Sequence, residues 1–257
     1  MHAILLAGQP NQGLLKNVAK VPYEADIPVG ERAMGAWIVD ALKNSVAITS
    51  IGLVGPTSLV QDGVTLAPMV GDMFGNILSG LTTVPEHAEH VLFITSDIPW
   101  ITGPMIQAFI DMAPPEFDVV YPIITKEVTQ ARFPGTKRTY VRLKEGVFTG
   151  GNLFVARPGA IPRLKERAEV LLSHRKSPIK LAQDVGWGLL FRLVFGQLSI
   201  RQAEDRVGDI LGIRGKAIVF PYAEAGVDVD KPEDLALAHR ELGMLPEEAS
   251  GQGWERV

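Results

Sequence analysis

Residues 3–13 read AILLAGQPNQG, a short apolar run that leads directly into a loop of turn-forming residues. The apolar residues are continuous rather than alternating with polar ones, which is typical of a strand buried on both faces of a parallel sheet. Residues 91–97, VLFITSD, show the same pattern. Between these two stretches, apolar residues at positions 34, 38, 41 and 42 recur at helical spacing. Strands that alternate with helices predict an α/β fold with a mostly parallel sheet covered on both faces.

The alternation of strands and helices continues to residue 242. Further strands are predicted at residues 51–54, 119–121, 139–143, 152–156 and 217–220, and further helices at 74–81, 102–112, 162–173, 179–195, 199–211 and 232–242. No repeat, low-complexity tract or long linker divides this pattern. We therefore expect one domain over residues 1–243 with a helical insertion at about 161–215, followed by a polar C-terminal tail at 244–257.

Composition excludes several classes of protein. The chain has 257 residues and a net charge of −4, which argues against a nucleic-acid partner. It has no cysteine, so disulfide scaffolds, zinc–thiolate sites and cysteine nucleophiles are excluded. No apolar run is long enough to span a membrane. We expect a cytoplasmic protein.

Three loops are candidate ligand sites, because ligands of open parallel sheets bind beyond the carboxyl ends of the strands. They are residues 7–13, the loop at Ser96-Asp97, and residues 227–230. In the first loop, glycine leaves room for backbone N–H groups to approach phosphates. The loop matches neither the P-loop nor the dinucleotide-binding fingerprint. A nucleotide-binding loop and a simple tight turn both remain open for it.

Asp97 is predicted to be a metal-holding carboxylate. Four apolar residues, 91–94, deliver it to the end of a strand, and Pro99 then turns the chain away. A hard divalent cation such as Mg²⁺ prefers carboxylate oxygen together with substrate phosphate. The alternative is an aspartate that merely starts a turn. The position at the end of a buried strand favours the functional interpretation.

A second pair of carboxylates lies in residues 226–235, GVDVDKPEDL. If this segment is extended, Asp228 and Asp230 point to the same side. Two carboxylates on one side repel each other unless a cation or hydrogen-bond donors lie between them. Asp230 also fits an N-cap whose capping box is completed by Glu233, and the two roles are compatible. For Asp228, a structural role and a ligand role both remain open.

Taken together, Leu-Ala-Gly at 6–8, Thr-Ser-Asp-Ile-Pro at 95–99 and Val-Asp-Lys-Pro-Glu-Asp-Leu at 229–235 resemble the MobA-like NTP transferases. This group of nucleotidyltransferases includes molybdenum-cofactor guanylyltransferase and sugar-phosphate cytidylyl- and uridylyltransferases. The resemblance extends over residues 1–243. It implies a Rossmann-like three-layer α/β sandwich with a mostly parallel mixed sheet, of the nucleotide-diphospho-sugar transferase type. The implied reaction is attack of a phosphate or alcohol oxygen on the α-phosphorus of a nucleoside triphosphate, with release of pyrophosphate.

The resemblance also implies partners and site residues. The partners are a nucleoside triphosphate, a small phosphorylated acceptor, and Mg²⁺ or Mn²⁺. Asp97 and Asp230 are implied as metal-binding and catalytic residues, with Asp228 as a neighbouring ligand. The residues implied for the nucleotide are Leu6, Ala7, Gly8, Gln9, Asn11, Gly13, Gly71 and Asn76, and those implied for the acceptor are Gly151 and Asn152.

The chain departs from the family pattern at two places. Gln9 replaces a second glycine, and residues 22–25, PYEA, place Glu24 where a phosphate-neutralising lysine is expected. A carboxylate there repels a triphosphate. Either another cation such as Lys16, Lys20 or Arg32 supplies the charge, with Lys16 as the candidate catalytic residue, or the chain is a non-catalytic nucleotide sensor. A glycosyltransferase that uses a nucleotide sugar is a further alternative, although residues 96–99 lack its Asp-x-Asp motif.

Two further segments carry predictions. Residues 132–144 hold five cations, and most of them fit a solvated hairpin. Among them, Arg138 is predicted to contact an acceptor phosphate, because arginine binds phosphate through two donors at once. Residues 187–195, WGLLFRLVF, are apolar nearly all round as a helix. They predict burial in the core or in a dimer interface, with a lipid-binding groove as the less favoured alternative.

Overall fold

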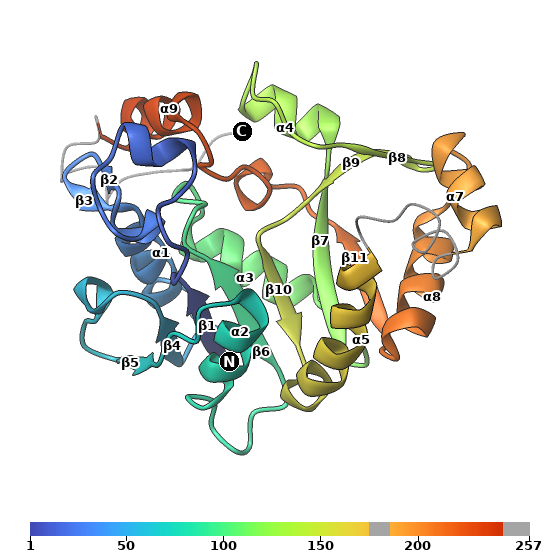
Figure 1. The fold of residues 1–257 in the computed structure, drawn as a ribbon, viewed down its shortest axis with the longest axis horizontal. Helices are drawn as coiled ribbons and strands as arrows, with labels where there is room; N and C mark the ends of the chain where they lie inside the picture. The colour runs from blue at the N-terminus through green and yellow to red at the C-terminus, as the bar shows by residue number, and fades with distance from the viewer. Residues whose placement is uncertain (175–185, 244–257) are drawn as a thin grey trace.

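The computed structural model describes residues 1–174 and 186–243. Within these residues, nine strands form one sheet in the order β5-β4-β1-β6-β10-β7-β9-β8, with β11 beside β7 (Figure 1). The strands are β1 His2–Leu6, β4 Ser50–Val54, β5 Val64–Ala67, β6 Val91–Thr95, β7 Val119–Thr125, β8 Val141–Leu143, β9 Gly146–Gly150, β10 Leu153–Ala156 and β11 Gly215–Val219. A short hairpin, β2 Pro28–Val29 and β3 Arg32–Ala33, lies apart from this sheet.

The sheet is mixed, and its parallel part places the predicted loops together. Strands β5, β4, β1 and β6 are mutually parallel, whereas β10 runs antiparallel to both β6 and β7. Leu6 at the end of β1 lies opposite Val54 of β4 and Thr95 of β6. These strands therefore end at one level, and the loops that follow them meet at one edge of the sheet.

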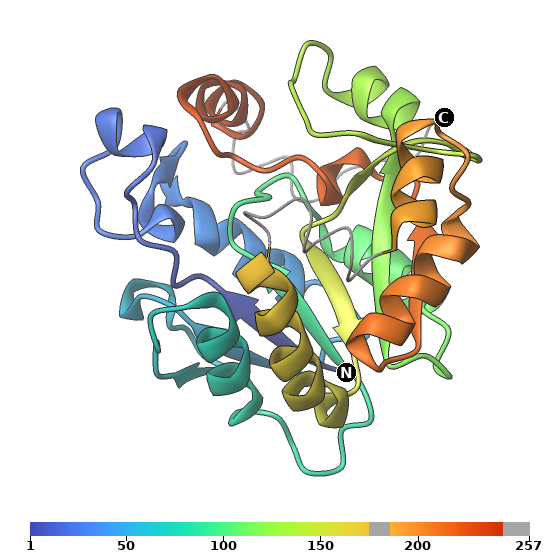
Figure 2. The same ribbon diagram turned by 45° about the vertical axis from the view of Figure 1, so that its right-hand side comes forward.

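Helices cover both faces of the sheet (Figure 2), which gives the three-layer α/β fold. They are α1 Met34–Lys43, α2 Met73–Leu81, α3 Gly103–Met112, α4 Lys126–Arg132, α5 Ile161–His174, α7 Trp187–Val194, α8 Ile200–Leu211 and α9 Pro232–Leu242. Leu5 packs in one core with residues of α1 and α3, and its neighbour Ile4 packs in another with residues of α2 and α5. Strand β1 is thus buried on both faces, as its continuous apolar sequence predicts.

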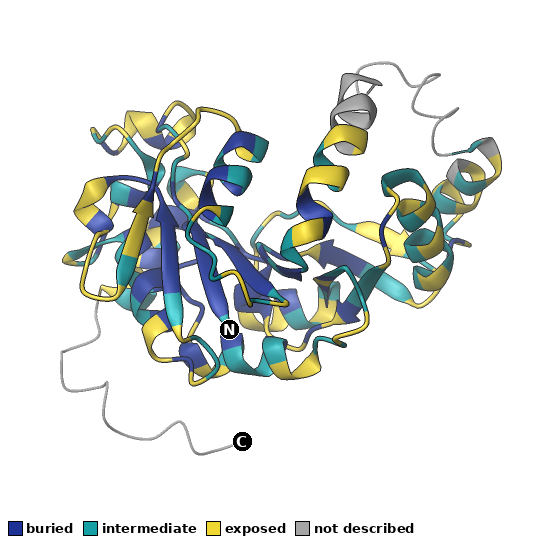
Figure 3. Cartoon of the chain, turned by 90° about the horizontal axis from the view of Figure 1, so that it is seen from below, coloured by how far each residue is buried: buried dark blue, intermediate teal, exposed yellow. Residues whose placement is uncertain are grey.

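The interpretation of residues 187–195 as a core segment is wrong. Helix α7 lies at the periphery with α8, and the described side chains of both helices are exposed or only partly buried (Figure 3). Phe191, Val194 and Phe195 are 67%, 79% and 60% exposed. Three apolar side chains of this segment are therefore exposed in the part of the chain that the structure describes, and the dimer interface stays a prediction.

Some sequence-based expectations fall on residues outside those described. The range expected as a helical insertion contains α5, α7 and α8. The first part of the helix predicted at 179–195, up to residue 185, lies outside the described residues, as does the predicted tail at 244–257. Among the helices that are described, none combines the length and apolarity needed to cross a bilayer.

Candidate active site

Asp97 lies just beyond the carboxyl end of β6. Thr95, the last residue of this strand, donates its hydroxyl hydrogen to Asp97 Oδ1 at 2.5 Å. The fully buried Ile98 then returns the chain to the core. Burial raises the pKa of Asp97 to about 6; the Thr95 hydrogen bond lowers it, and the charge of Asp228 raises it further. The carboxylate is thus fixed where its ionisation is costly.

The segment from residue 225 to 230 crosses the end of the sheet beside Asp97. Asn152 N donates to Ala225 O at 2.7 Å, and Val229 N donates to Asp97 O at 2.8 Å. Val227 and Val229 are fully buried. Side chains alternate along an extended backbone, so Asp228 and Asp230 point away from the core into which Val227 and Val229 point.

This arrangement brings three carboxylates together. Asp97, Asp228 and Asp230 each offer an oxygen atom, and these atoms lie within 4.8 Å of one another. Burial raises the pKa of Asp230 to about 6, and its contact with Asp228 and the charge of Asp97 act in the same direction. An all-carboxylate group whose members repel one another is a donor set that suits a hard cation such as Mg²⁺ or Mn²⁺.

Asp230 does not cap helix α9, which corrects the capping interpretation. The N-cap residue is Lys231, and its side chain makes no capping hydrogen bond. The reason is Pro232, which occupies the first helical position and so makes the residue directly before it the cap. The side chain of Asp230 is left exposed at the carboxylate group.

Arg138, the predicted acceptor-phosphate contact, is engaged by two aspartates. Its guanidinium pairs with the carboxylate of Asp228 and donates to Asp228 O at 2.6 Å, and it lies 3.2 Å from Asp234 Oδ1. The side chain is only 7% exposed. Two of its nitrogens are therefore committed to aspartates, while its Nε is buried and has no partner among the described residues. Arg138 also lines the polar cavity beside the carboxylates, and its role as an acceptor-phosphate contact stays a prediction.

A polar cavity of about 220 Å³ adjoins the carboxylates. Its lining consists of Lys137, Arg138, Thr139, Thr149, Gly150, Asn152, Gly226, Asp228 and Asp230. A water molecule occupies about 30 Å³ in the liquid, so the cavity accommodates a small polar group. Asn152, predicted as an acceptor residue, lines it. Gly151 is buried beneath it, where its N donates to Pro122 O at 3.0 Å and its O accepts from the Tyr121 hydroxyl at 2.8 Å.

The glycine-containing loop after β1 starts from the same sheet edge. Leu6 ends the strand, and the N–H of the buried Ala7 donates to Val54 O at 2.8 Å. A side chain at Gly8 would meet Asn76 Nδ2 at 3.1 Å and Met69 Sδ at 3.3 Å. The structure therefore brings Asn76 and the loop together, as the family resemblance implies.

Other residues predicted for the nucleotide have mixed positions. Asn11 is buried, and its amide donates to Ala19 O at 2.9 Å and Val21 O at 3.1 Å, so it holds the loop rather than facing a ligand. Gln9 and Gly13 are exposed. Gly71 has a positive φ of 92° and open space around it, which places it in an exposed turn before α2.

Glu24 lies between this loop and the carboxylates. Its N–H donates to Gln9 O at 3.0 Å, and its Oε1 is 3.8 Å from the Cβ that a side chain at Gly13 would have. Burial raises the pKa of Glu24 to about 7, and the charges of Asp97, Asp230 and Asp228 raise it further. Lys16 lies nearby in sequence but is exposed on the short helix Leu14–Asn17, and within the described residues it forms no ion pair.

Three residues of the site are not among the functional candidates that the sequence indicates. Thr95 orients Asp97, Thr149 lines the cavity, and Asp234 pairs with Arg138. Asp234 belongs to the quoted motif at 229–235, and Thr95 to the motif at 95–99, so their positions carried a signal. No local pattern indicates Thr149, because its place depends on the pairing of β9 with β7.

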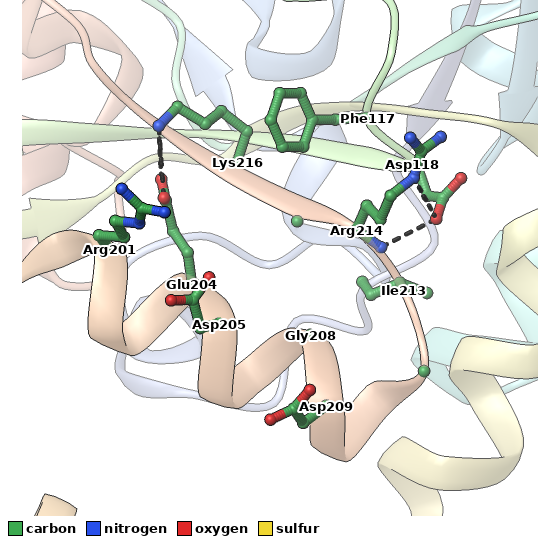
Figure 4. A pocket seen from close by; sticks show the side chains of 12 residues that line it. Phe117, Asp118, Arg201, Glu204, Asp205, Gly208, Asp209, Ile213, Arg214 and Lys216 are labelled. Carbon is green, nitrogen blue, oxygen red and sulfur yellow. Dashed lines mark hydrogen bonds and ion pairs between the residues drawn. The ribbon is translucent and has the colours of Figure 1, made fainter.

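A larger cavity, about 890 Å³, lies between α8 and the start of β11 (Figure 4). Its lining holds acids and bases, and four of them form two ion pairs, Lys216 with Glu204 and Arg214 with Asp118. Lys216 Nζ lies 3.2 Å from Glu204 Oε1, and Arg214 N donates to Asp118 Oδ2 at 2.8 Å. None of the three loops at the carboxyl edge lines it. Size alone therefore does not make it the better candidate.

No protein-family model and no curated protein matches the chain. A solved structure described as a hypothetical transferase from Thermus thermophilus is 39% identical, with a TM-score of 0.82 over 91% of this chain and 98% of that one. A 4-diphosphocytidyl-2C-methyl-D-erythritol synthase from Anaerococcus prevotii has a TM-score of 0.56 at 14% identity, over 93% and 94% of the two chains.

A CMP:2-keto-3-deoxy-manno-octonic acid synthetase, solved in complex with CTP, has a TM-score of 0.58 at 11% identity, over 93% and 98%. At such low identity these two likenesses concern the fold, which is that of the nucleotide-diphospho-sugar transferases. The hypothetical transferase is different, because 39% identity over nearly the whole length of both chains shows a common family. The chain belongs to the family of the hypothetical transferase from Thermus thermophilus.

Proposed function

We propose that this protein is a nucleotidyltransferase that depends on Mg²⁺ or Mn²⁺ and moves a nucleotidyl group to a small phosphorylated sugar, alcohol or cofactor. An acceptor oxygen attacks the α-phosphorus of a nucleoside triphosphate. The bond between that phosphorus and the α,β-bridging oxygen breaks, and pyrophosphate leaves with the electron pair. The observation that carries the proposal is the group Asp97, Asp228 and Asp230, which lies between the loop after β1 and a polar cavity.

The proposed roles follow the positions of the groups. Backbone N–H groups of Gly8, Gln9 and Gly13 bind the phosphates, because those of Asn11 and Gln12 already donate to Pro22 O and Pro10 O. Asn76 lies beside Gly8 and accepts from Val70 N at 2.8 Å in the segment before α2. Asp97 and Asp230 hold the divalent cation, with Asp228 as a further ligand. A cation bound there would neutralise charge on the α-phosphate. Catalysis in this scheme comes mainly from positioning and charge neutralisation.

The cavity beside the carboxylates is the proposed acceptor site. Lys137, Thr139, Thr149 and Asn152 give it one cation and several hydrogen-bonding groups, which suit an anionic or hydroxylated molecule. A phosphate acceptor is already anionic and needs no general base, so none is assigned. The fold of the CTP-bound synthetase and of the diphosphocytidyl-methylerythritol synthase supports the general reaction class. The motifs at 6–8, 95–99 and 229–235 support a MobA-like member of that class.

Pyrophosphate release tests the proposal. Each of the four common nucleoside triphosphates is combined with a panel of phosphorylated sugars and alcohols, in Mg²⁺ and in chelator. We expect release with at least one pair, dependent on the cation and on the acceptor. Transfer from a nucleotide sugar, without pyrophosphate release from any triphosphate, would identify a glycosyltransferase instead.

Glu24 favours one second candidate, a non-catalytic nucleotide sensor of the same fold. This carboxylate lies next to the loop proposed to bind phosphates, where the resemblance to the MobA-like transferases implies a lysine. Binding of a nucleoside triphosphate without turnover of any acceptor would favour the sensor. Either function uses nucleoside triphosphates, and together with the absence of cysteine this places the protein in the cytoplasm in our proposal.

A further inference from the structure

Asp234 is a buried carboxylate in the first turn of α9 that the proposed reaction does not use directly. It is 2% exposed. Its Oδ1 lies 3.2 Å from Arg138 Nη2, and its Oδ2 accepts a long hydrogen bond of 3.4 Å from Asp230 N. One side chain therefore touches the backbone of one carboxylate of the group and the arginine that holds another.

Arg138 transmits this contact to Asp228. Its Nη1 pairs with Asp228 Oδ1, and its Nη2 donates to Asp228 O as well as facing Asp234. The guanidinium is planar and rigid, so a shift of its partner on one side changes the direction of its donors on the other. Its side chain is also only 7% exposed, and its Nε has no hydrogen-bond partner in the described part of the chain.

Helix capping does not explain Asp234. Lys231 is the N-cap of α9, and Glu233 in the same first turn is exposed and already supplies negative charge to the helix start. Burying a further carboxylate is costly unless its partner is well placed. The start of a surface helix does not require a buried arginine shared by two aspartates, because desolvating these charges costs free energy. The same arrangement does fix the direction of the Asp228 carboxylate.

We propose that Asp234 is a positioning residue that sets the directions of Asp228, through Arg138, and of Asp230, through its backbone N–H. The inference rests on the proposed function, because it takes the group Asp97, Asp228 and Asp230 as the cation site. Outer groups that orient metal ligands typically account for about 10- to 100-fold in metal affinity. Asp234 is thus expected to affect cation binding although it is not itself a ligand.

The test measures binding of Mn²⁺ alone to the full chain by electron paramagnetic resonance, without substrate or turnover. Asp234→Asn keeps the size of the side chain and removes its charge. We expect its dissociation constant for Mn²⁺ to rise about 10-fold or more. Glu233→Gln removes the same charge from the same turn at an exposed position, and Glu241→Gln breaks the ion pair of α9 with Arg132. Both control variants should bind Mn²⁺ like the wild type.

A second variant separates charge from direction. Arg138→Lys keeps the positive charge but lacks the planar fork, so positioning predicts the same loss of Mn²⁺ binding, whereas a purely electrostatic role predicts none. Circular dichroism establishes whether each variant is folded. If Asp234→Asn does not fold, the Mn²⁺ affinity of Arg138→Lys tests the positioning role in its place. Wild-type affinity in folded Asp234→Asn, or an equal loss in Glu233→Gln, overturns the positioning role and leaves the proposed function intact. A wild-type protein that binds no Mn²⁺ overturns the proposed function, and the positioning role with it.

Discussion

The carboxylate of Asp97 receives a hydrogen bond from Thr95 and has two other carboxylates within 4.8 Å. The charge of Arg138 also acts on Asp97, but its guanidinium pairs with Asp228 and Asp234. A divalent cation would remove the repulsion that the metal-free protein contains. The same residue is therefore expected to lower stability without metal and to be required for binding with it.

Asp97→Asn tests both halves of this expectation. Without metal, the variant should be at least as stable to heat as the wild type, because one repelling charge has gone. With Mg²⁺, its affinity for nucleoside triphosphate should fall by at least about 100-fold. Loss of a residue that only orients a metal ligand already costs up to about 100-fold in metal affinity, and Asp97 is proposed as a ligand itself. Thermal unfolding and calorimetric titration measure the two effects. Asp111→Asn on α3 is the control, and equal Mg²⁺-dependent affinity in variant and wild type would contradict the assignment.

Because Glu24 occupies the position where a lysine is expected, another cation must neutralise the triphosphate in an active transferase. If the chain is an active transferase, Lys16→Ala or Lys20→Ala should weaken transition-state or triphosphate binding by about 1.5–3 kcal/mol, roughly 10- to 150-fold, as for a hydrogen bond to a charged group. Glu24→Lys should leave triphosphate binding unchanged or improve it. Steady-state kinetics of the three variants provide the measurement. Unchanged turnover in both alanine variants would show that neither lysine supplies the charge.

At the scale of elements, helix α2 packs unusually close to the sheet. A Cβ at Gly80 would lie 2.5 Å from Ile4 Cγ2 of β1 and 3.2 Å from Val54 Cγ2 of β4. Gly80 therefore allows the close approach that sets the distance between this helix and the strands that carry the loops of the site.

Gly80→Ala and Gly188→Ala separate packing from helix propensity. Alanine in a helix is favoured over glycine by up to about 1 kcal/mol. At Gly188 in α7 no atom lies near the added Cβ, so the variant should gain a few tenths to about 1 kcal/mol in free energy of unfolding. At Gly80 overpacking should outweigh this gain and cost about 1–3 kcal/mol. Urea unfolding gives both values, and a stabilised Gly80→Ala variant would disprove the packing argument.

The elements show which sequence signals sufficed. Continuous apolar runs predicted β1 and β6, because runs this short, followed at once by turn-forming residues, favour strands buried on both faces over helices. Helix α4, KEVTQAR, was missed because it is short and polar and begins directly at the end of β7. Strand β5 was missed because Thr65 and Leu66 are exposed at the edge of the sheet, which removes the apolar pattern.

The site was predictable to the extent that local geometry determines it. Period-two alternation places Asp228 and Asp230 on one side, and the strand end places Asp97 at the edge. The engagement of Arg138 by Asp228 and Asp234 could not be inferred, because it depends on how the loop before β8 folds over α9. The exposure of α7 could not be inferred either, since an apolar helix looks the same whether or not another chain covers it.

For the whole molecule, the carboxylate group predicts an effect of pH. The pKa values of Asp97 and Asp230 are raised to about 6 and that of Glu24 to about 7. At pH values between the ordinary carboxyl pKa and these raised pKa values, the folded state therefore binds more protons than the unfolded state. Their contribution to stability is therefore present at low pH and declines as pH rises through this window.

Bound metal reverses this trend, because it displaces the protons and offsets the repulsion. The difference in unfolding temperature with Mg²⁺ and with chelator should be small near about pH 5 and grow up to about pH 8. Taking the difference cancels groups far from the site, such as His2 at the opposite end of β1. The variant Asp97→Asn should show a flatter curve. A difference that does not vary with pH would refute the link between these carboxylates and metal.

The segment from residue 225 to 230 joins the sheet through Asn152 and Asp97, and it carries two of the three carboxylates. During translation it leaves the ribosome after every strand of the sheet has been made. A nascent chain that stops before Asp228 has only one carboxylate of the group, Asp97, at the sheet edge. In the proposed reaction such a chain lacks two of the three groups that hold the cation, and a protein cut by a protease before Asp228 lacks them in the same way.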